Sequence, residues 1–267
     1  MSIKTTRKYR EELKEANLRL KKAYKEVRDS HIQIVFRLAV MAEYRDMTTG
    51  SHLVRIADYS AMIAQGMGLS KTEVQNVRYA SPMHDIGKII LPDSILKNKG
   101  KLTDDEREVM KRHPIAGAEI FRDSRSPIMQ ACGVIALTHH ERYDGSGYPY
   151  GLKGKEIPLY GRIVGVADVF DALTSKRPYK KAYSFERSVS MVTAMAGRNF
   201  DPDVVKAFVR SEERIRGVWE ANRDIEDFLD GVGGLGEAVP RLDLKIQLML
   251  GRAGRYNPRK MSGGKLR

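Results

Sequence analysis

Apolar and small residues recur at alternating steps of four and three through residues 7–40, and this spacing constrains the fold more than any other feature of the chain. Lysine, arginine and glutamate fill the positions between them. The pattern predicts one long helix whose residues 7–34 pair with a second copy in a coiled-coil homodimer. The alternative is a single helix that packs on the body of its own chain. The seam positions are Tyr9, Leu13, Ala16, Leu20, Ala23, Val27, Ser30 and Ile34.

The centre of the chain carries further helical patterns, and strand patterns are almost absent. Only 162–169 could be argued as a strand, and 167–174 favours a helix there. We therefore expect an all-α fold. Glycine and proline make 141–159 a long loop. Capping residues and apolar faces predict helices over 52–67, 71–87, 103–114, 115–122, 126–140, 185–196 and 203–211.

Composition argues against a membrane span and against a secreted, disulfide-bonded protein. No apolar run reaches the roughly 18 residues that a transmembrane helix needs. The single cysteine, Cys132, cannot form an intrachain disulfide. We expect a cytoplasmic protein in which Cys132 is a small buried residue.

The net charge of +13 suggests nucleic-acid binding, but its distribution argues against that class of function. Residues 1–28 hold ten basic and four acidic residues, and 241–267 hold eight basic and one acidic. These two ends account for the whole excess, so the segment between them is neutral. A nucleic-acid partner is therefore not expected.

Five of the six histidines fall where metal chemistry would use them: His52, His84, His113, His139 and His140. Neighbouring residues on a helix diverge by about 100°, so His84 and Asp85 could offer two ligands around one position. The Asp85 carboxylate could also bridge to a second ion, and Asp168 would help to complete two sets of ligands. Two ions about 3.5–4 Å apart can hold a hydroxide and clamp an in-line displacement at phosphorus. The sixth histidine, His31, is expected to have no special role.

The chain resembles the HD-GYP family, a branch of the HD metal-dependent phosphohydrolases, over about residues 35–210. The blocks that carry the resemblance are Arg45-Asp46, Thr49–His52, His84–Lys88, His113-Pro114, His139–Pro149, Asp168–Leu173 and Arg177–Lys180. The resemblance implies an HD-type helical bundle. We therefore divide the chain into a basic helical linker (1–34), a catalytic domain (35–211) and a basic, partly disordered C-terminal extension (212–267).

The resemblance also implies a function, the hydrolysis of cyclic di-GMP to pGpG or GMP by a bridging hydroxide in a two-metal site. Iron or manganese would be the ions. One ion would be held by His52, His84, Asp85 and Asp168, and the other by Asp85, His113, His139 and His140. Lys88 would lie near the scissile phosphate. Substrate would be bound by Arg177, Lys180, Gly147, Tyr148 and Pro149. A diguanylate cyclase, or an upstream sensor or receiver protein, is a further implied partner.

One departure from the family pattern bears on the number of ions. Some relatives place a glutamate four residues before the first histidine, where it helps to hold a third metal, whereas this chain has Thr48. We therefore expect two ions.

Two other functions stay open from the sequence. The chain could be a non-catalytic cyclic di-GMP sensor, or a phosphohydrolase of another cyclic dinucleotide. Among neighbouring residues, Asp171 could orient a ligand histidine or lie on a helix surface. Glu141 and Asp144 could be catalytic or could shape the loop.

Overall fold

Helix α2 (Gly50–Gly66) lies at the centre of the fold, where it contacts α3, α8, α10 and α11. The computed structural model describes residues 3–45, 50–98, 100–176 and 181–230. Leu53, Ile56, Tyr59 and Ile63 recur along α2 at helical spacing and are fully buried. Burial of this apolar face against four helices places the first turn of α2, with His52, inside the body.

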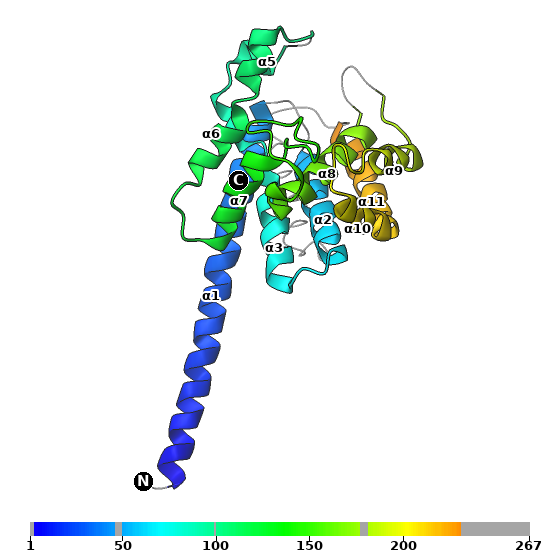
Figure 1. Cartoon of the computed structure of the whole chain (residues 1–267). Helices are drawn as coiled ribbons and strands as arrows, with labels where there is room; N and C mark the ends of the chain where they lie inside the picture. The colour runs from blue at the N-terminus through cyan, green and yellow to red at the C-terminus, as the bar shows by residue number, and fades with distance from the viewer. Residues whose placement is uncertain (1–2, 46–49, 99, 177–180, 231–267) are drawn as a thin grey trace, which may run out of the picture.

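The described residues form helices and loops with no strand, which confirms the all-α expectation (Figure 1). Within the described part of the chain, no helix is both long and apolar enough to cross a membrane. The remaining α-helices are α1 (Ile3–Arg45), α3 (Lys71–Ala80), α4 (Asp93–Leu96), α5 (Asp104–Met110), α6 (His113–Ile120), α7 (Pro127–Thr138), α8 (Leu159–Thr174), α9 (Phe185–Ala194), α10 (Pro202–Arg210) and α11 (Glu212–Asp230). Three short 3₁₀ helices are η1 (Ser81–Met83), η2 (Ile86–Ile90) and η3 (Gly154–Glu156).

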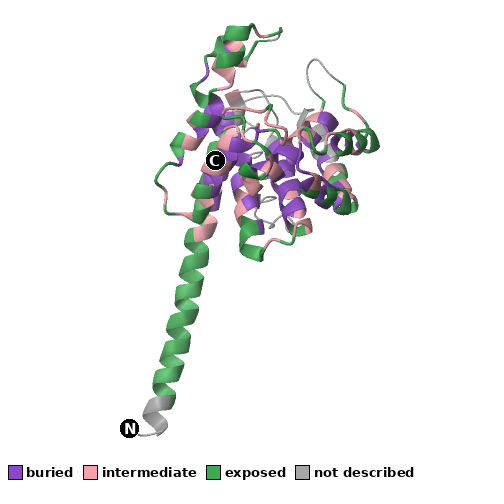
Figure 2. Cartoon of the chain, in the orientation of Figure 1, coloured by how far each residue is buried: buried purple, intermediate pink, exposed green. Residues whose placement is uncertain are grey.

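Helix α1 projects from the body and packs on it through its C-terminal part (Figures 1 and 2). Ile32, Val35, Phe36 and Ala39 are buried against the body. The large apolar residues of the predicted seam are instead exposed to solvent, at 58% for Tyr9, 63% for Leu13, 68% for Leu20, 55% for Val27 and 51% for Ile34. The alternative of a helix packed along its own chain is therefore wrong for the projecting part.

The predicted helix 71–87 is wrong in its second half. Helix α3 opens with a capping box between Ser70 and Glu73 and ends at Ala80. Pro82 follows at the start of η1, because a proline has no N–H to continue the α-helical ladder but is tolerated in a first turn. His84 and Asp85 consequently lie in the short turn between η1 and η2, not on one α-helix.

The predicted helix 103–114 is right at its start and wrong at its end. The capping box between Thr103 and Glu106 is present. The helix ends at Met110, and His113 begins α6 with Pro114 in its first turn. His113 is therefore held at the start of a helix that packs on α7.

The C-terminal part of the body is more ordered than the sequence indicated. Ser184 and Asp201 cap α9 and α10 as expected. Helix α11 follows at once, and its Ile215 is fully buried in the core. The first part of the predicted extension thus packs on the body, while residues 231–267 lie outside the described part of the chain. The three-part division of the chain stays a prediction.

Candidate metal centre

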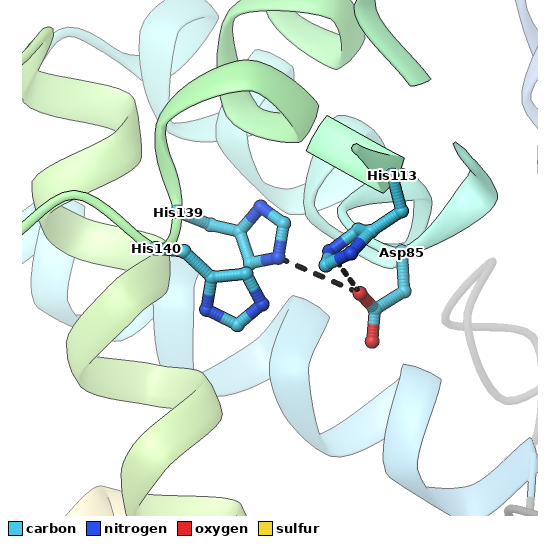
Figure 3. A group of neighbouring side chains, drawn as sticks. All are labelled: Asp85, His113, His139 and His140. Carbon is cyan, nitrogen blue, oxygen red and sulfur yellow. Dashed lines mark ion pairs between the residues drawn. The ribbon is translucent and has the colours of Figure 1, made fainter. Parts of the chain in front are cut away.

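Five segments of the fold meet in one place. They are the turn between η1 and η2, the first turn of α2, the start of α6, the end of α7 and the middle of α8. They bring together all seven residues predicted as metal ligands. The ligand atoms form two groups, each with its members within 4.8 Å of one another. One group is Asp85, His113, His139 and His140 (Figure 3), and the other is His52, His84 and Asp168.

Three of the histidines are oriented by the backbone of their own turn. In each, Nδ1 lies within hydrogen-bonding distance of a carbonyl oxygen three residues earlier in the chain. The distances are 2.9 Å from His84 to Ser81, 2.7 Å from His113 to Met110 and 3.0 Å from His139 to Ala136. Because a carbonyl oxygen can only accept, Nδ1 must carry the proton. With Nδ1 as the donor, the Nε2 lone pair of a neutral ring can bind a cation, which is the usual arrangement of a ligand histidine.

The carboxylate of Asp85 lies between these imidazoles. Its Oδ1 is 3.2 Å from His113 Nε2 and 3.5 Å from His139 Nε2 (Figure 3), and its Oδ2 is 3.3 Å from His84 Nε2. Asp85 Oδ1 and the Nε2 atoms of His113 and His139 are all buried, yet none makes a well-aligned hydrogen bond with a described residue. Buried polar atoms are expensive to leave unpaired, so three of them converging on one point fit a bound cation.

The charge states at the centre also suit a cation. Burial would raise the pKa of the Asp85 carboxyl, but the Lys88 ammonium and the neighbouring imidazoles outweigh it and hold that pKa well below its usual value. Burial lowers the pKa of His139, and burial together with His139 lowers that of His140 further. The carboxylate is therefore ionised and these rings are neutral near pH 7, as metal binding requires.

His52 is oriented by a carboxylate rather than by the backbone. Its Nδ1 lies 2.7 Å from Oδ2 of Asp171, one helical turn after Asp168 on α8. Asp171 is 1% exposed, so the interpretation of Asp171 as a surface carboxylate is wrong. Burial raises the pKa of Asp171, but Arg55 and His52 outweigh it and hold that pKa below its ordinary value.

Arg55 is a residue of the centre that the sequence analysis missed. Its guanidinium is almost fully buried and donates from Nε and Nη2 to the two oxygens of Asp171, and from Nη2 to Ser175 Oγ at 2.9 Å. The signal was available, because Arg55 lies three residues after His52 and so on the same face of the predicted helix.

The loop after His140 is closed by Glu141. Its carboxylate accepts hydrogen bonds from the backbone N–H groups of Tyr150, at 2.8 Å, and Leu152, at 3.0 Å. Glu141 therefore shapes the loop. A Cβ at Gly147 would lie 2.3 Å from the Arg142 backbone nitrogen, so only glycine fits there. This packing places the Tyr148 ring on that of His140, with centroids 4.7 Å apart.

Lys88 lies beside the centre on η2, with Nζ 2.9 Å from Asp85 Oδ2. Pro149 follows Tyr148 in the closed loop. Three residues of the predictions, namely Thr48 and the substrate-binding pair Arg177 and Lys180, lie outside the described residues. His31 is exposed on α1, away from the centre.

A family model described as an HD domain matches residues 37–204, so the chain belongs to the HD domain family. The match covers the seven clustered residues. The resemblance to the HD-GYP branch is confirmed by the relatives.

One relative is a cyclic di-GMP phosphodiesterase response regulator, RpfG, of Xanthomonas campestris, which is 47% identical over 74% of this chain and 52% of its own length. Another is a 3'3'-cGAMP-specific phosphodiesterase of Vibrio cholerae, which is 42% identical over 68% of this chain and 35% of its own length. The chain thus spans about half the length of the first relative and about a third of the second. A crystal structure of a cyclic GMP-AMP-specific phosphodiesterase of V. cholerae shares the fold, with a TM-score of 0.55, 21% identity, and coverage of 87% of this chain and 61% of that one.

Proposed function

We propose that this chain is a metal-dependent phosphodiesterase that hydrolyses cyclic di-GMP to pGpG or GMP at the centre around Asp85. The observation that carries the proposal is the convergence of Asp85 Oδ1 with the Nε2 atoms of His113 and His139, all buried and all without a well-aligned hydrogen bond among the described residues. The relative named as a cyclic di-GMP phosphodiesterase, at 47% identity, supports the substrate.

The ligand set favours two divalent ions that prefer nitrogen and oxygen donors. Imidazole and carboxylate groups suit iron or manganese, and no thiolate is present in either group. Asp85 would be shared by the two ions, and the position of its two oxygens near different histidines supports this role. When bound, the two ions would supply Lewis acidity toward the phosphate and acidify a water between them.

The chain's own residues supply positioning and charge around the reacting phosphate. The Lys88 ammonium, next to Asp85, would neutralise charge on the phosphoryl oxygens or protonate the leaving oxygen. Tyr148 offers a half-buried ring at the edge of the centre for a guanine base. Arg177 and Lys180 would bind the substrate phosphates, as a guanidinium fork and a point charge can.

A second candidate is the hydrolysis of another cyclic dinucleotide, which the 42%-identical cGAMP-specific relative favours. A third is a sensor that binds the nucleotide without turnover. Anaerobically purified protein, loaded in turn with Fe²⁺ and Mn²⁺, should be assayed against cyclic di-GMP, 3'3'-cGAMP and cyclic di-AMP. We expect the highest kcat/KM for cyclic di-GMP. A preference for cGAMP selects the second candidate, and binding without turnover selects the sensor.

The exposed seam of α1 supports a homodimer. Burying these side chains between two copies would remove apolar surface from water, which is the driving force for coiled-coil pairing. The double variant Leu13→Asp/Leu20→Asp should be monomeric by light scattering. Leu18→Asp is the matched control, since Leu18 is 70% exposed and lies off the seam. An unchanged mass for the double variant would contradict the dimer. We also propose that a sensor, receiver or cyclase partner would act on the centre through α1.

A further inference from the structure

The end of α1 is tied to the turn that carries Lys88 through Arg45, a residue of the sequence motifs that the proposed function leaves without a role. Arg45 Nη1 donates to the carbonyl oxygen of Ile89. Its Nη2 donates to the carbonyl of Leu91 at 3.1 Å and to Oδ1 of Asp93 at 2.7 Å. One guanidinium therefore joins the last residue of α1 to three residues that follow Lys88.

These contacts provide hydrogen-bond donors at the C-terminal end of the short helix η2. The last carbonyls of any helix have no partner within it, and a cation at that end also interacts favourably with the helix dipole. Ile89 and Ile90 are 49% and 60% exposed, so at this end of η2 apolar packing comes from Leu91, which is 2% exposed. Arg45 supplies the donors.

The other end of η2 is fixed by close packing. A Cβ at Gly87 would lie 1.9 Å from the carbonyl oxygen of His113, so the backbone of η2 rests directly on the start of α6. Lys88 lies between this packed end and the end held by Arg45. Its backbone N–H bonds to Asp85, and its carbonyl accepts from Leu91.

We propose that Arg45 is a positioning residue that sets where the Lys88 ammonium stands relative to Asp85, and that α1 acts on the centre through this contact. The inference rests on the proposed role of Lys88. A shift of α1 changes the carbonyl positions at Ile89 and Leu91, and the turn between them and Gly87 must follow. The projecting helix thereby has a direct mechanical route to the centre.

The test is a set of kinetic measurements on the full chain loaded with metal. A displacement of about 1 Å can cost about 100-fold in rate, so Arg45→Gln should lower kcat by ~10-fold or more. KM and metal content should stay within about twofold, since the ligands are untouched. Arg107→Gln is the matched control, because Arg107 also donates to a backbone carbonyl and pairs with a carboxylate, but on α5. It should behave as the wild type.

The decisive comparison is Arg45→Gln in a Lys88→Ala background. If Arg45 acts through Lys88, the double variant is no slower than Lys88→Ala alone. An additional loss equal to that of the single variant, or an Arg45→Gln enzyme as fast as the control, overturns the proposal.

Amide exchange in residues 86–91 provides a readout without turnover. It should rise in Arg45→Gln and not in Arg107→Gln, and unchanged exchange also overturns the proposal. A wild type without turnover would contradict the proposed function instead. Amide exchange in residues 86–91 would still test whether Arg45 holds the end of η2.

Discussion

Replacing Asp171 with asparagine should both destabilise the protein and weaken the half of the centre that contains His52. The carboxylate accepts from Arg55 Nε and Nη2 and from His52 Nδ1, and both Asp171 and Arg55 are almost fully buried. An asparagine keeps the shape of the side chain. It removes the charge and turns one acceptor into an N–H₂ donor that faces donors.

The magnitude follows from the burial of the pair. Removing one member of a buried ion pair costs about 3–5 kcal/mol, because the remaining charge is left in the interior without compensation. For a chain of this size each kcal/mol lowers Tm by roughly 2–4 °C, so we expect a fall of about 6–20 °C. Loss of the contact that orients His52 should also weaken metal affinity by about 10–100-fold.

Thermal unfolding followed by circular dichroism measures the first effect, and metal titration of the apoprotein measures the second. Asp58→Asn is the matched control. Asp58 pairs with Arg78, but their side chains are 22% and 29% exposed, so the expected cost is about 1 kcal/mol or less. An Asp171→Asn protein with the Tm of this control would refute the account of the buried pair.

The pH dependence of this difference has a defined sign. The pKa of Asp171 is held below its ordinary value of 3.8, so the folded state favours the ionised form. The stabilisation is present above that ordinary value and is lost as the pH falls through the lower folded-state pKa. The gap in Tm between wild type and Asp171→Asn should therefore be widest near neutral pH and narrow in acid. A gap that widens in acid would contradict this sign.

Two further substitutions test other parts of the centre. Gly87→Ala should lower Tm and displace His113, because the new Cβ would lie 1.9 Å from the His113 carbonyl oxygen. Circular dichroism measures the change in Tm, and metal titration measures the effect of displacing His113. A variant with unchanged Tm and metal affinity would refute the close approach. Glu141→Ala should cost about 3 kcal/mol by leaving two backbone N–H groups without their acceptor, and should raise KM by freeing the loop of Tyr148. Asp144→Ala, which removes an exposed acceptor in the same loop, should have little effect on either quantity, and a Glu141→Ala enzyme equal to it would contradict the loop-closing role.

The seven clustered residues were predictable because the histidine and aspartate blocks are specific in sequence. Their local structure was less predictable. His84 and Asp85 were expected to diverge from one α-helix, and they instead lie in a turn between two 3₁₀ helices, the first of which contains Pro82. His113 was expected at the end of a helix and begins one, because Pro114 is accommodated in a first turn. A proline marks a break in the pattern without saying on which side the helix lies.

The sequence places Arg55 on the same helix face as His52, but it does not give the partners of Arg55 or of Arg45. Each acts through contacts that are distant in the chain, Arg55 with Asp171 and Arg45 with the end of η2. An arginine on a predicted helix is usually a solvated surface residue, and only tertiary packing distinguishes these two. The same limit applied to α11, whose Ile215 is buried although 212–267 was expected to be a partly disordered extension.

The holding of two ions by Asp85 is what the proposed phosphodiesterase centre depends on. It is tested most directly by metal content and cyclic di-GMP turnover of anaerobically purified wild type, Asp85→Ala and the exposed control His31→Ala. We expect two ions per protomer and turnover for the wild type and for His31→Ala, and the loss of both ions and of turnover for Asp85→Ala. An Asp85→Ala protein that keeps its ions or its turnover would contradict the account, as would a reproducible content near three ions in the wild type.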